Sequence, residues 1–345
     1  MSHRPPRDLD EQARQARAKL TAHRGMATWG ERLVPLGAFR EAARGHGLAL
    51  PPGERAAALA TRRTALPDPT PVEGPFSRIL VFGGVYSNHF ALAALLDEAG
   101  RLGVEAVYCL GDLGAFGPSP ERVWPLLEAA GVRSIQGNYE ESLASGREDC
   151  NCGYTDPRDN HFAELSYRYT EGHCSAAFKA WMGALPRRRR VRLGVGLKAR
   201  ELLLVHGSPR RINEFLFEST APVPFLEALL DQNGCDGLLC THTGLHWHRR
   251  LPSGRDVVNV GVIGRPANDG RTAVWYALLE APAEDDAASP GIGVELRPLA
   301  YDVEGLAAEM RRERLPEEFV ETVLTGWWTT CLEILPARER QKSRF

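Results

Sequence analysis

Residues 78–84 read Arg78-Ile-Leu-Val-Phe-Gly-Gly84, a short apolar run that ends in two glycines. Such a run is typical of a strand that is buried on both faces and continues into a loop. Helical apolar spacing follows over residues 88–101, and a second apolar run spans 104–110. A helix is predicted over 121–130 and a third strand over 132–136. This alternation indicates βαβ units and an α/β fold with a mostly parallel core sheet.

The overall composition excludes several classes of protein. The chain has 345 residues, a formal charge of −2, 43% hydrophobic residues and 25% charged residues. These values predict roughly two globular domains without a general attraction to nucleic acid or to an anionic membrane. No apolar run approaches the length of a membrane span, and the N-terminus lacks the apolar segment of a secretory signal. We therefore expect a cytoplasmic protein.

Changes in composition divide the chain into three parts. Residues 1–75 are expected to form an extension with helices over 9–20 and 56–63 and a proline-rich linker over 67–75. Residues 76–300 are expected to form the main domain, and 301–345 a helical tail. Within the main domain, the sequence favours an irregular insert over 148–169, a solvated turn at the arginine run 187–190, and an antiparallel second half after residue 257. The tail is predicted as two amphipathic helices broken near Leu315-Pro316 and followed by Trp327-Trp328.

Two of the seven cysteines lie in a polar stretch rather than in an apolar run. Cys150 and Cys152 occur in Glu-Asp-Cys-Asn-Cys-Gly. An odd cysteine count without an export signal argues against a disulfide framework, so free thiols are expected. A thiolate at either position could reach a metal ion, and a thiol-based redox function centred on this pair is a further alternative.

Four polar residues follow buried strands and are flanked by small residues. They are Asp112 after Gly111, Asn138 after Gly137, His206 before Gly207, and His242 between two threonines. The carboxyl ends of strands in such sheets carry functional groups. One carboxylate, one amide oxygen and two imidazoles suit Mn²⁺, Fe²⁺ or Zn²⁺. The sequence therefore predicts a metal site that holds one or two ions.

The order of these motifs resembles that of the calcineurin-like metallophosphoesterase superfamily. The motifs are Gly111-Asp112 with Gly117-Pro118, Gly137-Asn138, His206-Gly207, Thr241-His242-Thr243, and Asn259-Val-Gly-Val-Ile-Gly264. The resemblance covers about residues 77–280. It implies a four-layer α/β/β/α sandwich whose site lies at the strand carboxyl ends. It also implies hydrolysis of a phosphomonoester or a phosphodiester, with two metal ions and an attacking hydroxide.

The resemblance is incomplete at one half of the implied site. Asp112, Asn138, His206 and His242 match the ligands of the second metal ion, and Asp112 would bridge both ions. Three ligands of the first ion are replaced by Gly84, Tyr86 and Gly244. The histidine that assists the leaving group in the family is replaced by Tyr139.

Three interpretations of this half-site remain open from the sequence. One metal ion suffices for hydrolysis, or the missing site is rebuilt from Tyr86, Cys150, Cys152, His246 or His248. In the third interpretation, catalysis is lost and the fold binds a phosphorylated ligand or partner.

Further residues have expected supporting roles. Asp112, Asn138, His206 and Arg210 are the expected catalytic residues, and Arg210 or Arg211 would grip phosphate oxygens. Glu140 either supports the site or only begins a helix. The expected substrate is small and phosphorylated, a nucleic-acid or membrane partner is not expected, and a homo-oligomer is considered.

Overall fold

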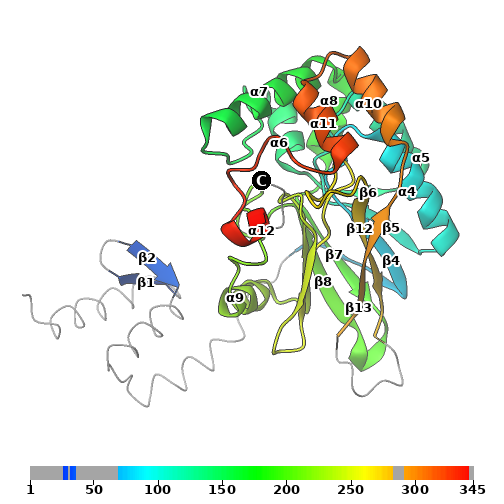
Figure 1. Ribbon diagram of the computed structural model, residues 1–345. Coiled ribbons are helices and arrows are strands. Elements are labelled where there is room, and N and C mark those ends of the chain that lie inside the picture. Colours follow the sequence, from blue (N-terminus) through cyan, green and yellow to red (C-terminus); the bar gives the residue numbers. More distant parts are fainter. Residues whose placement is uncertain (1–25, 30–31, 36–68, 283–290, 342–345) are drawn as a thin grey trace, which may run out of the picture. The chain divides into compact units, whose positions relative to one another are not determined.

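The computed structural model describes residues 26–29, 32–35, 69–282 and 291–341. The chain divides into two compact units, Met1–Thr64 and Ala65–Phe345. In the first unit the described residues form an antiparallel hairpin of β1 (Met26–Trp29) and β2 (Arg32–Pro35). The helices expected over 9–20 and 56–63 lie outside the described residues. The second unit carries all the motifs discussed above (Figure 1).

Two sheets form the centre of the second unit. In spatial order, the six-stranded sheet contains β10 (Trp247–Arg250), β11 (Asp256–Asn259), β9 (Gly237–Cys240), β8 (Arg200–Val205), β7 (Arg188–Leu193) and β3 (Val72–Phe76). The five-stranded sheet contains β13 (Gly293–Leu299), β12 (Val274–Glu280), β4 (Arg78–Phe82), β5 (Ala106–Cys109) and β6 (Arg133–Ser134). The pairs β4–β5, β5–β6, β8–β9 and β9–β11 are parallel.

Helices cover the outer faces of both sheets. They are α4 (His89–Leu102), α5 (Val123–Ala129), α6 (Asn138–Ser145), α7 (Pro157–Gly172), α8 (Ala176–Ala184), α9 (Val223–Asn233), α10 (Val303–Arg312), α11 (Glu317–Thr325) and α12 (Ala337–Gln341). Short 3-10 turns span Pro120–Arg122 and Gly196–Lys198. Helices α7, α10 and α11 pack together at the upper end of the sheets in Figure 1.

Three apolar clusters separate four layers. Successive residues of a strand point to opposite faces, and β4 shows this directly. Leu80 and Phe82 pack under α4 and its neighbours, whereas Ile79 and Val81 face the other sheet. Leu203 of β8 packs against α9 on the far side. The chain therefore has the four-layer α/β/β/α sandwich that the resemblance implied.

Several local expectations are wrong. The expected linker contains β3, which pairs with β7 at the edge of the six-stranded sheet. Pro75 is tolerated there because proline has no N–H to donate and an edge strand pairs on one side only. The expected irregular insert includes α7, and the arginine run lies largely in β7. The second half of the domain is not wholly antiparallel, because β11 pairs in parallel with β9.

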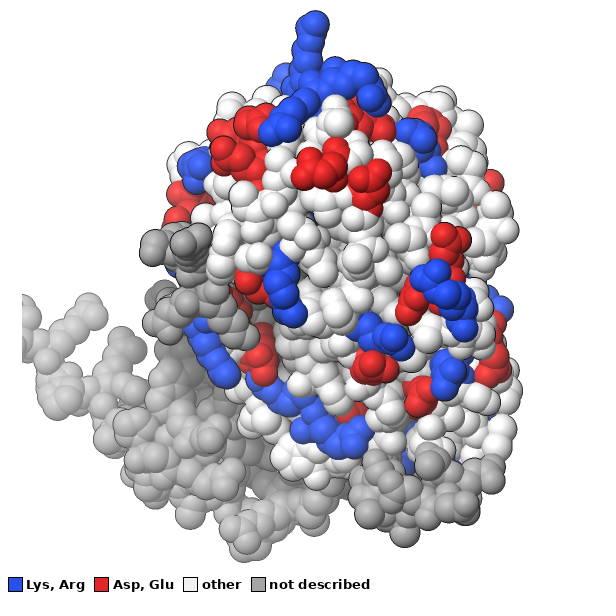
Figure 2. Space-filling model, turned by 45° about the vertical axis from the view of Figure 1, so that its right-hand side comes forward, with Lys and Arg blue, Asp and Glu red and all other residues white. Residues whose placement is uncertain are grey.

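The surface carries both signs of charge. On the face in Figure 2, basic and acidic side chains are interspersed with uncharged surface, without a broad area of one sign. Among the described residues, no helix combines the length and apolar character needed to cross a membrane.

Candidate metal centre

Loops from both sheets bring the four predicted ligands together. Asp112 and Asn138 follow β5 and β6 of the five-stranded sheet, and Asn138 is the first residue of α6. His206 and His242 follow β8 and β9 of the six-stranded sheet. Parallel pairing of β5 with β6 and of β8 with β9 places each pair of loops at one end of its sheet, and the contacts between the side chains bring the two pairs together.

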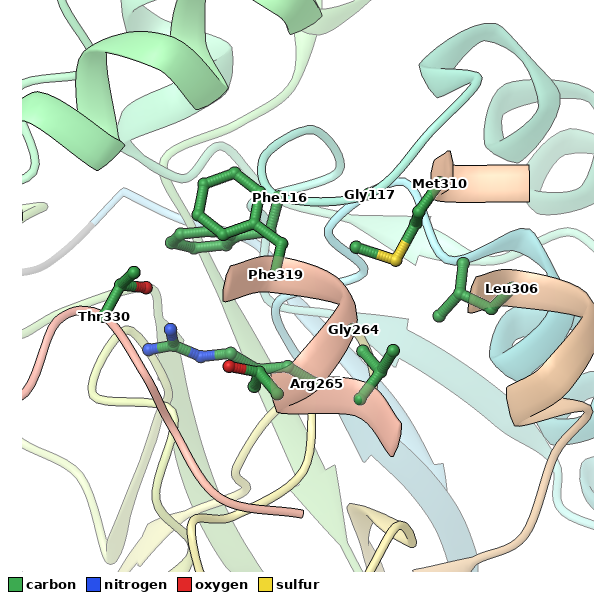
Figure 3. A pocket seen from close by; sticks show the side chains of 10 residues that line it. Phe116, Gly117, Gly264, Arg265, Leu306, Met310, Phe319 and Thr330 are labelled. Atoms are coloured by element: carbon green, nitrogen blue, oxygen red, sulfur yellow. The ribbon is translucent and has the colours of Figure 1, made fainter. Parts of the chain in front are cut away.

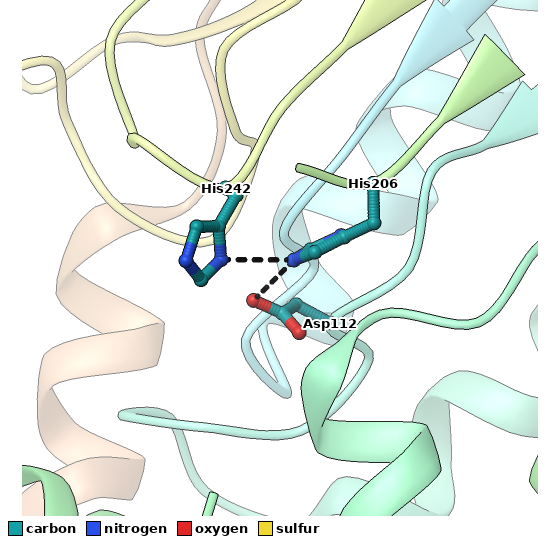
Figure 4. A group of neighbouring side chains, drawn as sticks. All are labelled: Asp112, His206 and His242. Carbon is teal, nitrogen blue, oxygen red and sulfur yellow. Dashed lines mark hydrogen bonds and ion pairs between the residues drawn. The ribbon is translucent and has the colours of Figure 1, made fainter. Parts of the chain in front are cut away.

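His206 lies at the centre of the group. Its Nε2 atom is 3.3 Å from Asp112 Oδ2, 3.0 Å from Asn138 Oδ1 and 3.1 Å from His242 Nδ1. One ligand atom each from Asp112, His206 and His242 lies within 4.8 Å of the others (Figure 4). All four side chains are buried, and His242, the most exposed of them, is 8% exposed.

The hydrogen bonds around this group leave acceptor atoms of Asp112, Asn138 and His206 facing one another, and His242 Nδ1 joins them in the tautomer that carries its proton on Nε2. His206 donates its Nδ1–H to the carbonyl oxygen of Leu110 at 2.6 Å, so the neutral ring presents a lone pair at Nε2. Asn138 donates its Nδ2–H to the carbonyl oxygen of Cys150 at 2.8 Å, so its Oδ1 faces His206. A single proton on His206 could satisfy only one of the three atoms around it. A metal ion that all four atoms coordinate would satisfy their lone pairs together. The residues therefore fit a metal ion.

The electrostatics of the site favour a bound cation. Burial by itself raises the pKa of Asp112, but the interaction with His206 outweighs burial and the pKa is lowered. Burial likewise opposes charge on His206, yet Asp112 raises the pKa of this imidazole. Burial and the neighbouring His206 lower the pKa of His242 to about 3, so this ring remains neutral. A carboxylate beside a neutral imidazole is the protonation state that metal binding requires.

Glu140 holds the two loops that carry Asp112 and Asn138. Its Oε2 accepts the backbone N–H groups of Asp112 at 2.8 Å and Gly137 at 2.6 Å, and its Oε1 accepts that of Leu113 at 2.8 Å. Gly137 has no room for a side chain, because a Cβ there would lie 2.5 Å from Asp112 Oδ1. Glu140 therefore positions the site rather than only beginning α6.

Asn259 fixes the loop that carries His242. Its Nδ2 donates to the carbonyl oxygen of Thr241 at 3.0 Å and to Thr243 Oγ1 at 2.9 Å, and its Oδ1 accepts the N–H of Gly261 at 3.1 Å. His242 and Asp112 both have left-handed backbone conformations, with φ of 67° and 56°. Such conformations are costly for residues other than glycine and concentrate at functional sites.

The other half of the implied two-metal site is closed. A Cβ at Gly84 would lie 2.8 Å from Val262 Cβ, and a Cβ at Gly244 would lie 2.8 Å from Trp328 Cη2. Tyr86 is 3% exposed, and burial raises the pKa of its phenol, which opposes the phenolate form considered from the sequence.

The cysteines differ from the sequence expectation. Cys150 and Cys152 form a disulfide bond, so neither offers a thiolate to a metal ion in this state. Only one residue separates the two cysteines in the sequence. The odd number of cysteines in the chain gave no indication of this local bond. Asn138 Nδ2 lies 3.5 Å from the Cys152 sulfur atom, so the disulfide borders the site.

Three further residues considered from the sequence have other contacts. His246 stacks on Trp275 with ring centroids 3.7 Å apart. His248 pairs with Asp256 at 2.8 Å because the register of β10 and β11 brings them close. Arg210 is exposed, pairs with Glu214 at 3.5 Å and lies over the Phe225 ring. Among the described residues, none of these groups contacts the four central side chains.

Aromatic residues cover the site. Phe215 lies 4.4 Å from His242 between ring centroids, and Tyr154 lies 6.0 Å from Phe215. Trp328, which follows α11, packs against Gly244. Sequence reasoning missed Phe215 and also Arg265, which directly follows the Asn259–Gly264 segment singled out above.

Comparisons with known proteins agree with the fold. The chain is 23% identical to a metallophosphoesterase from Sphaerobacter thermophilus of known structure, with a TM-score of 0.54 over 73% of this chain and 99% of that one. It is 20% identical to the hypothetical protein PH1004 from Pyrococcus horikoshii, with a TM-score of 0.58 and the same coverage. The uncharacterized protein MJ0912 of Methanocaldococcus jannaschii is 21% identical over 267 residues, 72% of this chain and 98% of that protein. No family model matches the chain. The chain therefore shares the fold of the metallophosphoesterase from Sphaerobacter thermophilus.

Proposed function

We propose that this protein is a metal-dependent phosphoesterase that hydrolyses a small phosphomonoester or phosphodiester. The observation that carries the proposal is the convergence of four acceptor atoms on one buried point, from Asp112, Asn138, His206 and His242. With His206 neutral and His242 protonated at Nε2, all four atoms present lone pairs to one another, as the ligands of a metal ion do. The metallophosphoesterase fold supports the same conclusion at the level of the fold.

The four side chains would hold one Mn, Fe or Zn ion. Bound there, such an ion supplies a Lewis acid for a phosphoryl oxygen and lowers the pKa of a water molecule. Asp112 contributes the negative charge of the site, and the Leu110 carbonyl orients His206 by accepting its Nδ1–H. The aromatic cover excludes bulk water, which strengthens the electrostatic interactions inside. Because the ligands are at most 8% exposed, a substrate reaches them when a covering segment moves.

A second function shares the metal but not the reaction. The packing around Gly84 and Gly244 leaves no room for ligand side chains of a second ion at these two positions. This favours a protein that binds a phosphorylated ligand without hydrolysing it. The two functions differ in turnover, so an assay separates them.

The test compares two aspartates in the full-length protein. Wild-type protein loaded with Mn²⁺, Fe²⁺ or Zn²⁺ is assayed with an aryl phosphomonoester and an aryl phosphodiester, and its metal content is measured. The Asp112→Asn variant is expected to lose both metal and turnover, whereas Asp97→Asn, at an exposed position on α4, retains both. Metal binding without turnover favours the second function. A wild-type protein that binds no metal contradicts both.

A further inference from the structure

Arg265 is a buried cation beside the closed half of the site. It is 6% exposed, and its Nε atom has no hydrogen-bond partner. Its guanidinium carbon lies 3.7 Å from the ring centroid of Trp328, 4.8 Å from that of Phe116 and 5.7 Å from that of Tyr86. Figure 3 shows its side chain along the wall of a cavity that it lines together with Phe116, Phe319 and Thr330.

No carboxylate among the described residues forms an ion pair with Arg265. The acidic groups that interact with it are the thiol of Cys331 and the phenols of Tyr86 and Tyr154. Burial raises the pKa of both phenols, so they are neutral near pH 7. A buried charge is costly when it lacks a partner, and buried arginines are normally paired with anions. The surroundings of Arg265 therefore lack the carboxylate that would normally accompany it.

The position of Arg265 relates it directly to the metal centre. Its Nη2 atom lies 3.4 Å from the place that a Cβ of Gly244 would occupy, two residues after His242. Tyr86 interacts electrostatically with both Arg265 and Asp112, and the Arg265 guanidinium lies over its ring. A permanent positive charge thus lies beside Tyr86 and Gly244, two of the three positions where the resemblance placed ligands of another ion.

We propose that Arg265 binds the phosphate group of the ligand and takes the electrostatic role of the missing metal ion. The site then works with one metal ion and one guanidinium. This inference rests on the proposed function, because that function supplies the phosphate. A planar guanidinium can donate two parallel hydrogen bonds to phosphate oxygens and remains charged at all physiological pH values. The stacking on Trp328 and Phe116 would hold the guanidinium plane in place.

Inorganic phosphate is the probe that tests the inference. Its binding to the full-length, metal-loaded protein is measured by calorimetry and by the shift that it causes in Tm, and the bound metal per chain is measured in parallel. Arg265→Met is expected to weaken phosphate binding about 10- to 100-fold and to abolish the Tm shift. The variant should keep one metal ion per chain. Arg271→Met is the matched control, because Arg271 is an exposed arginine of the same loop that pairs with Asp269 and lies over Trp275.

Stability separates a binding role from a purely structural one. Replacing an unpaired buried charge by an apolar side chain is often neutral or stabilising, so Arg265→Met is expected to have an unchanged or higher Tm without phosphate. Arg265→Lys keeps a charge and provides a second variant if the first does not fold. It is expected to bind phosphate less tightly than wild type, because an ammonium group lacks the paired donors.

Three results would overturn the inference, and they have different meanings. If wild-type protein binds metal and phosphate and both Arg265 variants bind phosphate within twofold of wild type, only the role of Arg265 is wrong. If wild-type protein binds neither metal nor phosphate, the proposed function fails as well. Two metal ions per wild-type chain would also contradict the inference, because Arg265 would then replace nothing.

Discussion

Removing the acceptor oxygens of Glu140 should loosen the loops of the metal centre. Glu140 is fully buried and accepts three backbone N–H groups. In Glu140→Ala all three donors lose their partner, and at about 1–3 kcal/mol for each, the cost is roughly 3–9 kcal/mol. Glu140→Gln is milder. Its amide group can face Leu113 while its oxygen keeps the bonds from Asp112 and Gly137, so one bond is lost at about 1–3 kcal/mol.

The neighbouring Glu141 provides a matched control on the same helix. Both residues lie in the first turn of α6, so both changes to glutamine remove one charge from the helix N-terminus. Glu141 pairs with Arg187 and accepts no backbone N–H of the loops. Such an ion pair at a partly exposed position contributes about 0–1 kcal/mol.

Urea unfolding of the three variants at pH 7 measures these differences. We expect the free energy of unfolding to fall in the order wild type, Glu141→Gln, Glu140→Gln and Glu140→Ala. Metal affinity should follow, with about a 10- to 100-fold loss in Glu140→Gln, because loss of a residue that orients metal ligands has this effect. Equal stabilities of Glu140→Gln and Glu141→Gln would refute the reasoning, because the buried hydrogen bonds would then contribute nothing measurable.

Three more predictions concern other parts of the domain. Asn259→Ala removes three buried hydrogen bonds around the His242 loop and should lower the free energy of unfolding by about 2–4 kcal/mol in a urea titration; a loss below 1 kcal/mol would contradict this. Because Cys150 and Cys152 form a disulfide, alkylation of the denatured protein should label five cysteines without a reductant and all seven after reduction. Mass spectrometry counts the labels. Seven labels without a reductant would show that the bond is absent. Burial lowers the pKa of His89 despite its contact with Glu309. Below about pH 6.5 the unfolded chain therefore binds more protons at this residue than the folded chain does. The free energy of unfolding should then fall as the pH decreases from 7 to 5. The fall should be smaller in His89→Gln, and an unchanged pH dependence would exclude His89 as its source.

The sequence was sufficient to predict the layered fold and the grouping of the four ligands. Short apolar runs such as 78–82 must be buried on both faces, which requires layers on either side of the sheet. Polar residues directly after such runs meet at one end, because the parallel strands end there. Asp112, Asn138, His206 and His242 follow this rule, and each is flanked by small residues that allow close approach.

Features that depend on tertiary partners were not predictable. Helix α7 buries polar residues, among them Ser166 and Thr170, which accept the backbone N–H groups of Phe116 and Ala115. Its buried face is therefore partly polar, and for this reason the sequence favours an irregular insert rather than an amphipathic helix. The arginine run favours a solvated turn in the sequence, but Arg190 lies in β7 and pairs with Glu201 of β8 at 2.5 Å. Local patterns do not show such partners.

Arg265 illustrates the same limit at the site itself. A charged residue after a glycine predicts an exposed loop, because arginine is rarely buried without a partner. Its burial depends on Trp328, which lies more than sixty residues later in the chain. Only the folded arrangement brings this side chain to the closed half of the site.

Anomalous scattering from crystals of the metal-loaded protein would locate the bound ions and their ligands. We expect one anomalous peak for each chain in this region, within bonding distance of Asp112, Asn138, His206 and His242, with the Arg265 guanidinium on the side of Gly244. Two peaks, or a peak that these four side chains do not surround, would contradict it.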